Sequence, residues 1–233
     1  MMALRSDQSS RGADKTTVPG VIRLAGAIAC LCSVLQANVA AQTVESSAAS
    51  KPVPSAASEV HVRMKTALGN IDIMLDARRA PLSTSNFLRY VRAGLYDGGV
   101  FHRTVTLSNQ PANRIKIEVI QAAANPARTN QFFPPIQLER TRDTGLKHRD
   151  GTISMARSEP NTAQDEFFIC LGDQPELDFG GKRNPDGQGF AAFGRVVRGM
   201  EVVRKIQQAP AKAQSLTPAV PIEGVTITPL NSR

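Results

Sequence analysis

The stretch Val100-Phe101-His102-Arg103, directly after the glycine pair Gly98-Gly99, places an aromatic ring two positions from a guanidinium group. A strand is expected here, and side chains in a strand alternate between two faces. Phe101 and Arg103 are therefore predicted to share one face, with His102 on the other. A fixed guanidinium beside an apolar surface suits a ligand that carries both an apolar group and an amide. The alternative is structural, with Phe101 in a core and Arg103 in a supporting hydrogen bond.

The other residue types that could do chemistry are scattered along the chain. His61, His102 and His148 form no i, i+4 pair and have no carboxylate at ligand spacing, so no metal site is predicted. Ser154 lacks the turn that presents the nucleophile of a hydrolase. Cys170 follows an apolar run and is expected to be a small buried residue. The sequence therefore argues against a metal centre, a hydrolase triad and a catalytic thiol.

The composition allows a sizeable core and gives the chain a basic balance. The 233 residues are 41% hydrophobic, which suits one large domain or two small ones. The formal net charge of +8 indicates attraction of the protein to anionic surfaces. No concentrated lysine or arginine run and no zinc-finger or basic-helix pattern is present, so a solvated basic surface is predicted and a nucleic-acid partner is not.

Residues 1–41 have the pattern of a secretory signal peptide. Basic residues precede an apolar run over 24–35, and Val39-Ala40-Ala41 supplies small residues where a signal peptidase cuts. The run is short for a membrane span. An exported, periplasmic protein is therefore predicted, with an uncleaved anchor or a lipoprotein cut at Cys30 as alternatives.

Cleavage near Ala41 would remove Cys30 and Cys32 and leave Cys170 alone, so no internal disulfide is expected. Residues 42–59 are rich in Ser, Ala, Val and Pro and are predicted to be a flexible linker. The folded domain is predicted over residues 60–230.

The pattern of this domain is that of many short strands with two helices and long loops. Apolar–polar alternation predicts a hairpin of strands at 60–66 and 71–75. A helix is expected over 81–93 and a second one from residue 199. Further strands are expected at residue 101 and at 115–121, 151–156, 167–171, 190–197 and 225–227. The polar segment 106–114 and the segments 122–135, 157–166 and 173–189 are predicted to be loops. A mainly-β single domain follows, either a sandwich or a barrel.

A series of short motifs resembles the cyclophilin family of peptidyl-prolyl cis-trans isomerases, from about Val60 to Ile227. The motifs occur in this order: Phe101-His102-Arg103, Val119-Ile120-Gln121, Ser154-Met155-Ala156, Asn161-Thr162, Phe167-Phe168-Ile169, Leu177-Asp178, Phe193-Gly194-Arg195-Val196-Val197 and Gly199-Met200. The resemblance implies a closed eight-stranded antiparallel β-barrel capped by two α-helices.

The resemblance also implies a peptidyl-prolyl isomerase without a cofactor or metal, with Arg103 as the catalytic residue. Gln121 corresponds to the family's glutamine that contacts the substrate backbone. The expected substrate-binding residues are Phe101, Val119, Gln121, Ala156, Arg157, Glu166, Phe168, Leu177 and Phe190. The expected partners are proline-containing segments of exported proteins. A monomer is expected, without nucleic acid and without stable membrane insertion after cleavage.

Several positions depart from the family pattern. Glu118 replaces an aromatic residue, Arg157 a common asparagine, Glu166 a common glutamine, and Glu176 a common tryptophan or phenylalanine. Asp165 and Glu166 could orient the guanidinium of Arg103 or could occupy it. The same barrel could therefore be a module that grips proline segments with little turnover. A carbohydrate- or lipid-binding β-domain is a further alternative, disfavoured by the absence of tryptophan.

Overall fold

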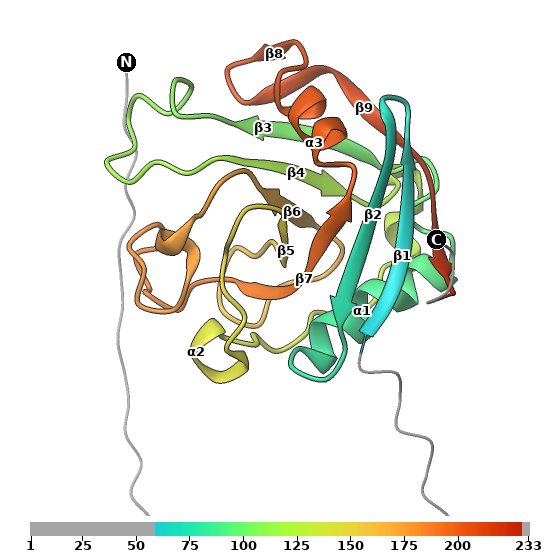
Figure 1. The fold of residues 1–233 in the computed structure, drawn as a ribbon, viewed down its shortest axis with the longest axis horizontal. Coiled ribbons are helices and arrows are strands. Elements are labelled where there is room, and N and C mark those ends of the chain that lie inside the picture. Colours follow the sequence, from blue (N-terminus) through green and yellow to red (C-terminus); the bar gives the residue numbers. More distant parts are fainter. Residues whose placement is uncertain (1–58, 230–233) are drawn as a thin grey trace, which may run out of the picture. The chain divides into compact units, whose positions relative to one another are not determined.

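The computed structural model describes residues 59–229, which form a closed antiparallel β-barrel (Figure 1). The strands are β1 (Glu59–Thr66), β2 (Gly69–Asp76), β3 (Val100–Val105), β4 (Val119–Ala123), β5 (Thr152–Met155), β6 (Phe167–Cys170), β7 (Ala191–Arg198), β8 (Ala211–Lys212) and β9 (Ser215–Thr228). Eight of them follow in the order β1-β2-β7-β5-β6-β4-β3-β9, and β9 pairs with β1 to close the ring. The short strand β8 pairs only with β9. The predicted barrel is confirmed, whereas the predicted signal peptide and residues 42–58 of the linker lie outside the described part of the chain.

The hairpin of β1 and β2 shows why the sheet closes around an apolar core. Met64, Ile71 and Ile73 are fully buried inside the barrel. Arg63 and Asp72 alternate with them and pair through hydrogen bonds of 2.6 and 2.9 Å. Each buried aliphatic side chain of this size contributes roughly 1.5–3 kcal/mol of transfer free energy. The alternation therefore fixes which face of the strands points inward, and the predicted hairpin is confirmed.

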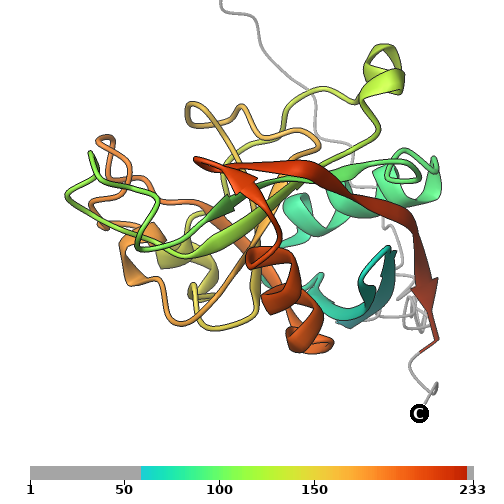
Figure 2. The ribbon, with the colours of Figure 1, turned by 90° about the horizontal axis from the view of Figure 1, so that it is seen from above.

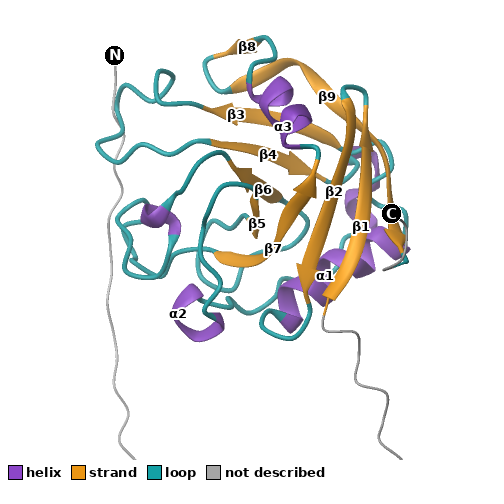
Figure 3. Ribbon diagram, in the orientation of Figure 1, coloured by secondary structure: helices purple, strands orange, loops and turns teal. Residues whose placement is uncertain are grey.

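The two longer helices, α1 (Pro81–Arg92) and α3 (Met200–Gln207), share contacts with β2 but otherwise pack against different strands (Figure 3). Helix α1 contacts β2, β7 and β9, and its buried stripe includes Phe87, Leu88 and Val91. Helix α3 contacts β2, β3 and β4 through its apolar side. Helix α2 is a single turn at Thr141–Thr144. No helix within residues 59–229 is long and apolar enough to cross a membrane.

Residues 106–118 form one long loop, although a strand was predicted to begin at residue 115. The side chain of Gln110 explains the difference, since its amide nitrogen donates to the carbonyls of Thr106 and Ile117, both at 2.7 Å. Its oxygen accepts from the Ile117 N–H at 3.3 Å. Gln110 is buried, and these bonds satisfy backbone groups that a strand ladder would otherwise pair. Strand β4 therefore begins only at Val119.

Strand β9 spans 14 residues, far more than the predicted strand at 225–227. Its first half pairs with β3 and its second half with β1. Pro218 and Pro221 lie within it, and proline normally argues against a strand because it cannot donate to the ladder. The length of β9 matters for the site, because it brings the turn at residues 213–214 beside β3.

Candidate active site

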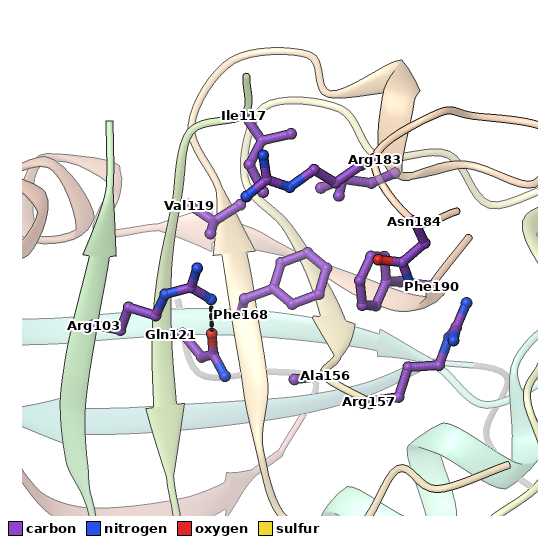
Figure 4. Close-up of a pocket in the computed structure, with 11 residues that line it drawn as sticks. Arg103, Ile117, Val119, Gln121, Ala156, Arg157, Phe168, Arg183, Asn184 and Phe190 are labelled. Atoms are coloured by element: carbon purple, nitrogen blue, oxygen red, sulfur yellow. Dashed lines mark hydrogen bonds between the residues drawn. The ribbon is translucent and has the colours of Figure 1, made fainter. Parts of the chain in front are cut away.

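A pocket of about 240 Å³ opens on the outer face of the barrel, over β3, β4 and β6 (Figure 4). Its wall comes from side chains that are far apart in the sequence: Arg103, Ile117, Val119, Gln121, Ala156, Arg157, Phe168, Leu177, Arg183, Asn184 and Phe190. Beneath it lies a second apolar cluster, separate from the barrel core, that includes Val119, Phe168 and Leu177. The barrel thus holds one apolar cluster inside and a smaller one under the pocket.

A β-bulge at His102 decides which way Arg103 points. Phe101 pairs with Ala122 and Arg103 with Gln121, and the register shifts between these pairs. Ala122 and Gln121 are consecutive, so they face opposite sides of β4. Phe101 is fully buried in the barrel core and does not line the pocket, whereas Arg103 does. The prediction that Phe101 and Arg103 share a face is therefore wrong, because the bulge inserts an extra residue between them.

The guanidinium of Arg103 is fixed by two glutamine side chains. Its Nε and one terminal nitrogen donate to Oε1 of Gln214, at 2.9 and 2.6 Å. The other terminal nitrogen donates to Oε1 of Gln121 at 2.9 Å, as Figure 4 shows. Burial lowers the pKa of Arg103, an effect that the charge of Glu166 opposes. An arginine remains charged throughout the physiological range, so the pocket presents an oriented cation.

Gln121 also donates through its amide nitrogen to the carboxylate of Glu166. Glu166 and Asp165 lie in an adjoining depression of about 270 Å³, which shares Gln121, Ala156 and Arg157 with the first pocket. The Asp165 carboxylate accepts from the backbone N–H of Ala124 at 3.1 Å, and burial raises the pKa of Asp165. Together the two depressions make a groove with a cationic end at Arg103 and acidic groups at the other end.

Phe168 forms the apolar floor of the pocket and is supported from behind by buried polar groups. His148 stacks on its ring, with 5.9 Å between centroids. The imidazole Nδ1 lies 2.8 Å from Asp178 and Nε2 lies 2.9 Å from the Ser154 hydroxyl. Burial lowers the pKa of His148, an effect that Asp178 opposes, so the ring is neutral at pH 7. The order Ser-His-Asp resembles a hydrolase triad, but Ser154 is fully buried, so these groups position Phe168 and do not face a substrate.

Arg157 lies in the wall of the pocket and fixes the loop that follows Asp178. Its side chain is 1% exposed and forms two hydrogen bonds to Asp186, at 2.8 and 3.1 Å. It also donates twice to the Gly189 carbonyl and lies over the ring of Phe190 at 5.2 Å. Phe190 in turn meets Phe168 edge to face. The arginine at this position is therefore a structural clamp that shapes the pocket wall.

The structure brings nearly all the predicted site residues together. Those that line the first pocket are Arg103, Val119, Gln121, Ala156, Arg157, Phe168, Leu177 and Phe190, and Glu166 lines the adjoining depression. Phe101 is the exception. Ile117, Arg183, Asn184 and Gln214 were not predicted. Each comes from a loop or turn, and no periodic pattern marks which loop residues fold over a distant strand.

Cys170 and the carboxylates do not add a second reactive centre. Cys170 is fully buried, and burial raises the pKa of its thiol well above the usual range. Among residues 59–229, no three His, Cys, Asp or Glu side chains gather as a group that could hold a metal ion. The chemistry offered by the groove is therefore an oriented cation, amide hydrogen bonds and an apolar floor.

Comparisons with known proteins agree with this geometry. Residues 61–227 match the family described as cyclophilin type peptidyl-prolyl cis-trans isomerase/CLD. Peptidyl-prolyl cis-trans isomerase A of Dickeya dadantii is 37% identical over 186 residues, which covers 79% of this chain and 90% of the relative. Peptidyl-prolyl cis-trans isomerase B of Escherichia coli is 32% identical over 167 residues, 71% of this chain and 95% of the relative.

Solved structures show the same fold at lower identity. A cyclophilin type peptidyl-prolyl cis-trans isomerase of Cryptosporidium parvum has 22% identity and a TM-score of 0.58, covering 73% of this chain and 98% of its own. The chain belongs to the cyclophilin-type peptidyl-prolyl cis-trans isomerase family. Its activity is that of the family, the cis-trans isomerisation of peptide bonds that precede proline.

Proposed function

We propose that Arg103 catalyses the isomerisation and that the pocket over Phe168 holds the proline ring. The observation that carries this proposal is the oriented guanidinium of Arg103 at the edge of a pocket whose apolar floor is Phe168. A pocket of about 240 Å³ with an apolar floor suits a five-membered ring, and the groove on either side suits an extended peptide.

The chemical demand of the reaction explains why a cation is useful here. A peptide bond resists rotation by ~18–20 kcal/mol because the nitrogen lone pair is delocalised into the carbonyl group. Before proline, the two isomers differ by only about 0.5–1 kcal/mol, so both are populated and exchange slowly. Rotation frees the lone pair on the prolyl nitrogen. A guanidinium that donates to that lone pair stabilises the twisted state more than either planar isomer, which lowers the barrier.

Each neighbouring side chain has a separate task in this proposal. Gln214 and Gln121 hold the guanidinium of Arg103 in place, so little reorganisation is needed as the bond twists. Gln121 also has an amide available to the substrate backbone once a peptide competes with Glu166. Phe168, Leu177 and Val119 grip the ring by excluding water. No covalent bond forms or breaks on the enzyme.

A protease-coupled assay with a proline peptide tests the role of the site. The protein should accelerate the slow cis phase, and Arg103→Ala should remove most of that acceleration. A protein that binds the proline peptide without accelerating its isomerisation would contradict the proposed catalytic role and would favour a binding module.

We propose further that the clients are exported proteins in the periplasm. The support is the sequence of residues 1–41, with its basic region, apolar run and small-residue cleavage site at Val39-Ala40-Ala41. N-terminal sequencing of the protein from an envelope fraction should give a mature start near Gln42. A mature N-terminus within the first twenty residues would contradict cleavage, and a lipid-modified Cys30 would make the protein a membrane-anchored lipoprotein.

A further inference from the structure

Arg183 places a third guanidinium on the wall of the proline pocket, beside Arg103 and the Arg157 that is paired with Asp186. It lies in the long loop between Asp178 and Phe190 and lines the same pocket as Arg103. In Figure 4 the guanidinium of Arg183 lies on the side of Phe168 near Ile117 and Val119, and that of Arg103 lies on another side of the ring. Two cations therefore approach one apolar floor from different elements of the fold.

The position of Arg183 is built by two loops. Figure 2 shows the loop at 106–118 (green) and the loop at 178–190 (orange) on the same side of the barrel. A terminal nitrogen of Arg183 donates to the carbonyl of Ile115 at 2.6 Å, and its backbone N–H donates to the backbone carbonyl of Glu176 at 3.2 Å. Arg157 fixes the far end of the same loop through Asp186. Arg183 is thus held half-buried over the pocket, and a single hydrogen bond occupies its guanidinium.

Among residues 59–229, neither guanidinium of this pair is neutralised by a direct ion pair, although the charge of Glu166 acts on Arg103. Within the described residues, neither Arg103 nor Arg183 forms an ion pair with a carboxylate, although nine other lysine or arginine side-chain pairs do. Burial and the charge of Arg103 both lower the pKa of Arg183, so the two cations lie within electrostatic range of each other. Arg183 is thus a half-buried cation beside a second cation and without an ion-pair partner in the described part of the chain, and this arrangement favours an anionic ligand next to it.

We infer that this pocket prefers substrates with a carboxylate on a residue directly flanking the proline, and that Arg183 is the residue that sets this preference. The inference rests on the proposed role of the pocket as the site of the proline ring. An acidic side chain next to the ring would receive a charge-assisted hydrogen bond from the Arg183 guanidinium, which is planar and suited to a carboxylate. A lysine in the same place would meet two cations. The acidic depression at Asp165 and Glu166 lies on the other side of Gln121, so the groove is electrically asymmetric.

The test compares matched peptides by two-dimensional exchange NMR, which needs no coupling protease. The reference peptide has glutamine on both sides of proline, and the others carry glutamate or lysine at one side. The full-length protein should process one of the two glutamate peptides about tenfold faster than the glutamine reference in kcat/KM, equivalent to about 1.4 kcal/mol. The matching lysine peptide should be slower than the reference.

Variants then assign the preference to one side chain. In Arg183→Gln the ratio of kcat/KM for the glutamate peptide to kcat/KM for the glutamine peptide should fall to within about twofold of one. Arg183→Lys should keep part of the preference for glutamate. Lys182→Gln is the matched control, because Lys182 is the exposed neighbour in the same loop and does not line the pocket. Its ratio should equal that of the parent protein.

The outcomes separate this inference from the proposed site. The inference is overturned if the parent protein has a glutamate-to-glutamine ratio of kcat/KM near one both before and after proline. It is also overturned if the preference for glutamate is unchanged in Arg183→Gln. Neither result contradicts the proposed proline pocket. If the preference is lost equally in Lys182→Gln, the overall charge of the loop sets it and Arg183 does not. If the glutamine reference is not accelerated at all, the proposed site falls together with the inference.

Discussion

Replacing Arg103 by alanine is the most direct test of the proposed mechanism. The guanidinium is held by three hydrogen bonds, two to Gln214 and one to Gln121, so its place at the pocket edge is well defined. One charge-assisted hydrogen bond made mainly in the twisted state is worth ~1.5–3 kcal/mol. Arg103→Ala should therefore lower kcat/KM by roughly 10- to 150-fold, measured with the protease-coupled proline-peptide assay. Arg103→Lys should rescue little, since lysine lacks the planar fork.

Gln214 allows a second measurement of the same interaction. Gln214→Ala leaves Arg103 in place but removes two of its three hydrogen bonds, which should cost about 1 kcal/mol or roughly fivefold in kcat/KM. In the Arg103→Ala background the same change should have almost no further effect, because Gln214 acts through the guanidinium.

Stability controls distinguish a chemical effect from unfolding. Arg103 is half-buried at an open pocket, so water can replace it as the partner of both glutamines. Circular dichroism should be unchanged and Tm should fall by only a few degrees. If Arg103→Ala stays folded and its kcat/KM remains within about twofold of the parent, Arg103 is not the catalytic group.

Three further predictions concern the floor of the pocket, its support and the absence of a metal requirement. Phe168→Ala should lower kcat/KM mainly by raising KM, because the ring is the apolar floor; steady-state kinetics on folded protein checks this. The folded state depresses the pKa of His148, so the unfolded chain binds the proton more readily. The contribution of His148 to the free energy of unfolding should therefore be fully present above about pH 6.5 and be lost progressively below it, and the dependence of Tm on pH in that lower range should be weaker in His148→Phe than in the parent. A chelator should leave the rate unchanged, and a loss restored by a divalent ion would overturn the mechanism.

The architecture could be predicted well from the sequence where periodicity is strong. The alternation over 60–66 and 71–75 defines a hairpin, and both longer helices carry clear apolar stripes. The ordered motifs around Arg103, Gln121 and Phe168 led to the family and to most of the pocket. Gln121 and Phe168 lie on strands that pair without a register shift, where the type of side chain and its face are coupled.

The errors arose where tertiary contacts override local pattern. The bulge at His102 reverses the relation between Phe101 and Arg103, and strict alternation cannot anticipate a bulge. Gln214 lies 111 residues after Arg103 in the sequence, in the turn that precedes β9. It is brought to Arg103 by the pairing of β9 with β3, and the two prolines in β9 argue against a strand there. The side chain of Gln110 donates hydrogen bonds to the backbone carbonyls of Thr106 and Ile117, and these bonds hold an alternating stretch of sequence in a loop. In each case the decisive contact depends on partners distant in sequence or on a single side chain without a period.

The carboxylates near the site raised the question whether they occupy Arg103 and leave a barrel that binds without turnover. The hydrogen bonds of these carboxylates show that neither of them occupies the guanidinium of Arg103. Asp165 turns its carboxylate to the Ala124 N–H, and Glu166 accepts from Gln121, which stands between it and the guanidinium. Glu166 acts on Arg103 only through its charge, raising a pKa that burial lowers. A hydrogen-bonded amide between acid and cation keeps the guanidinium in place without an ion pair that the substrate would have to break. The departures from the family pattern at Glu166 and Arg157 are thus compatible with the proposed role of Arg103, because Glu166 holds Gln121, which orients the guanidinium, and Arg157 shapes the pocket wall.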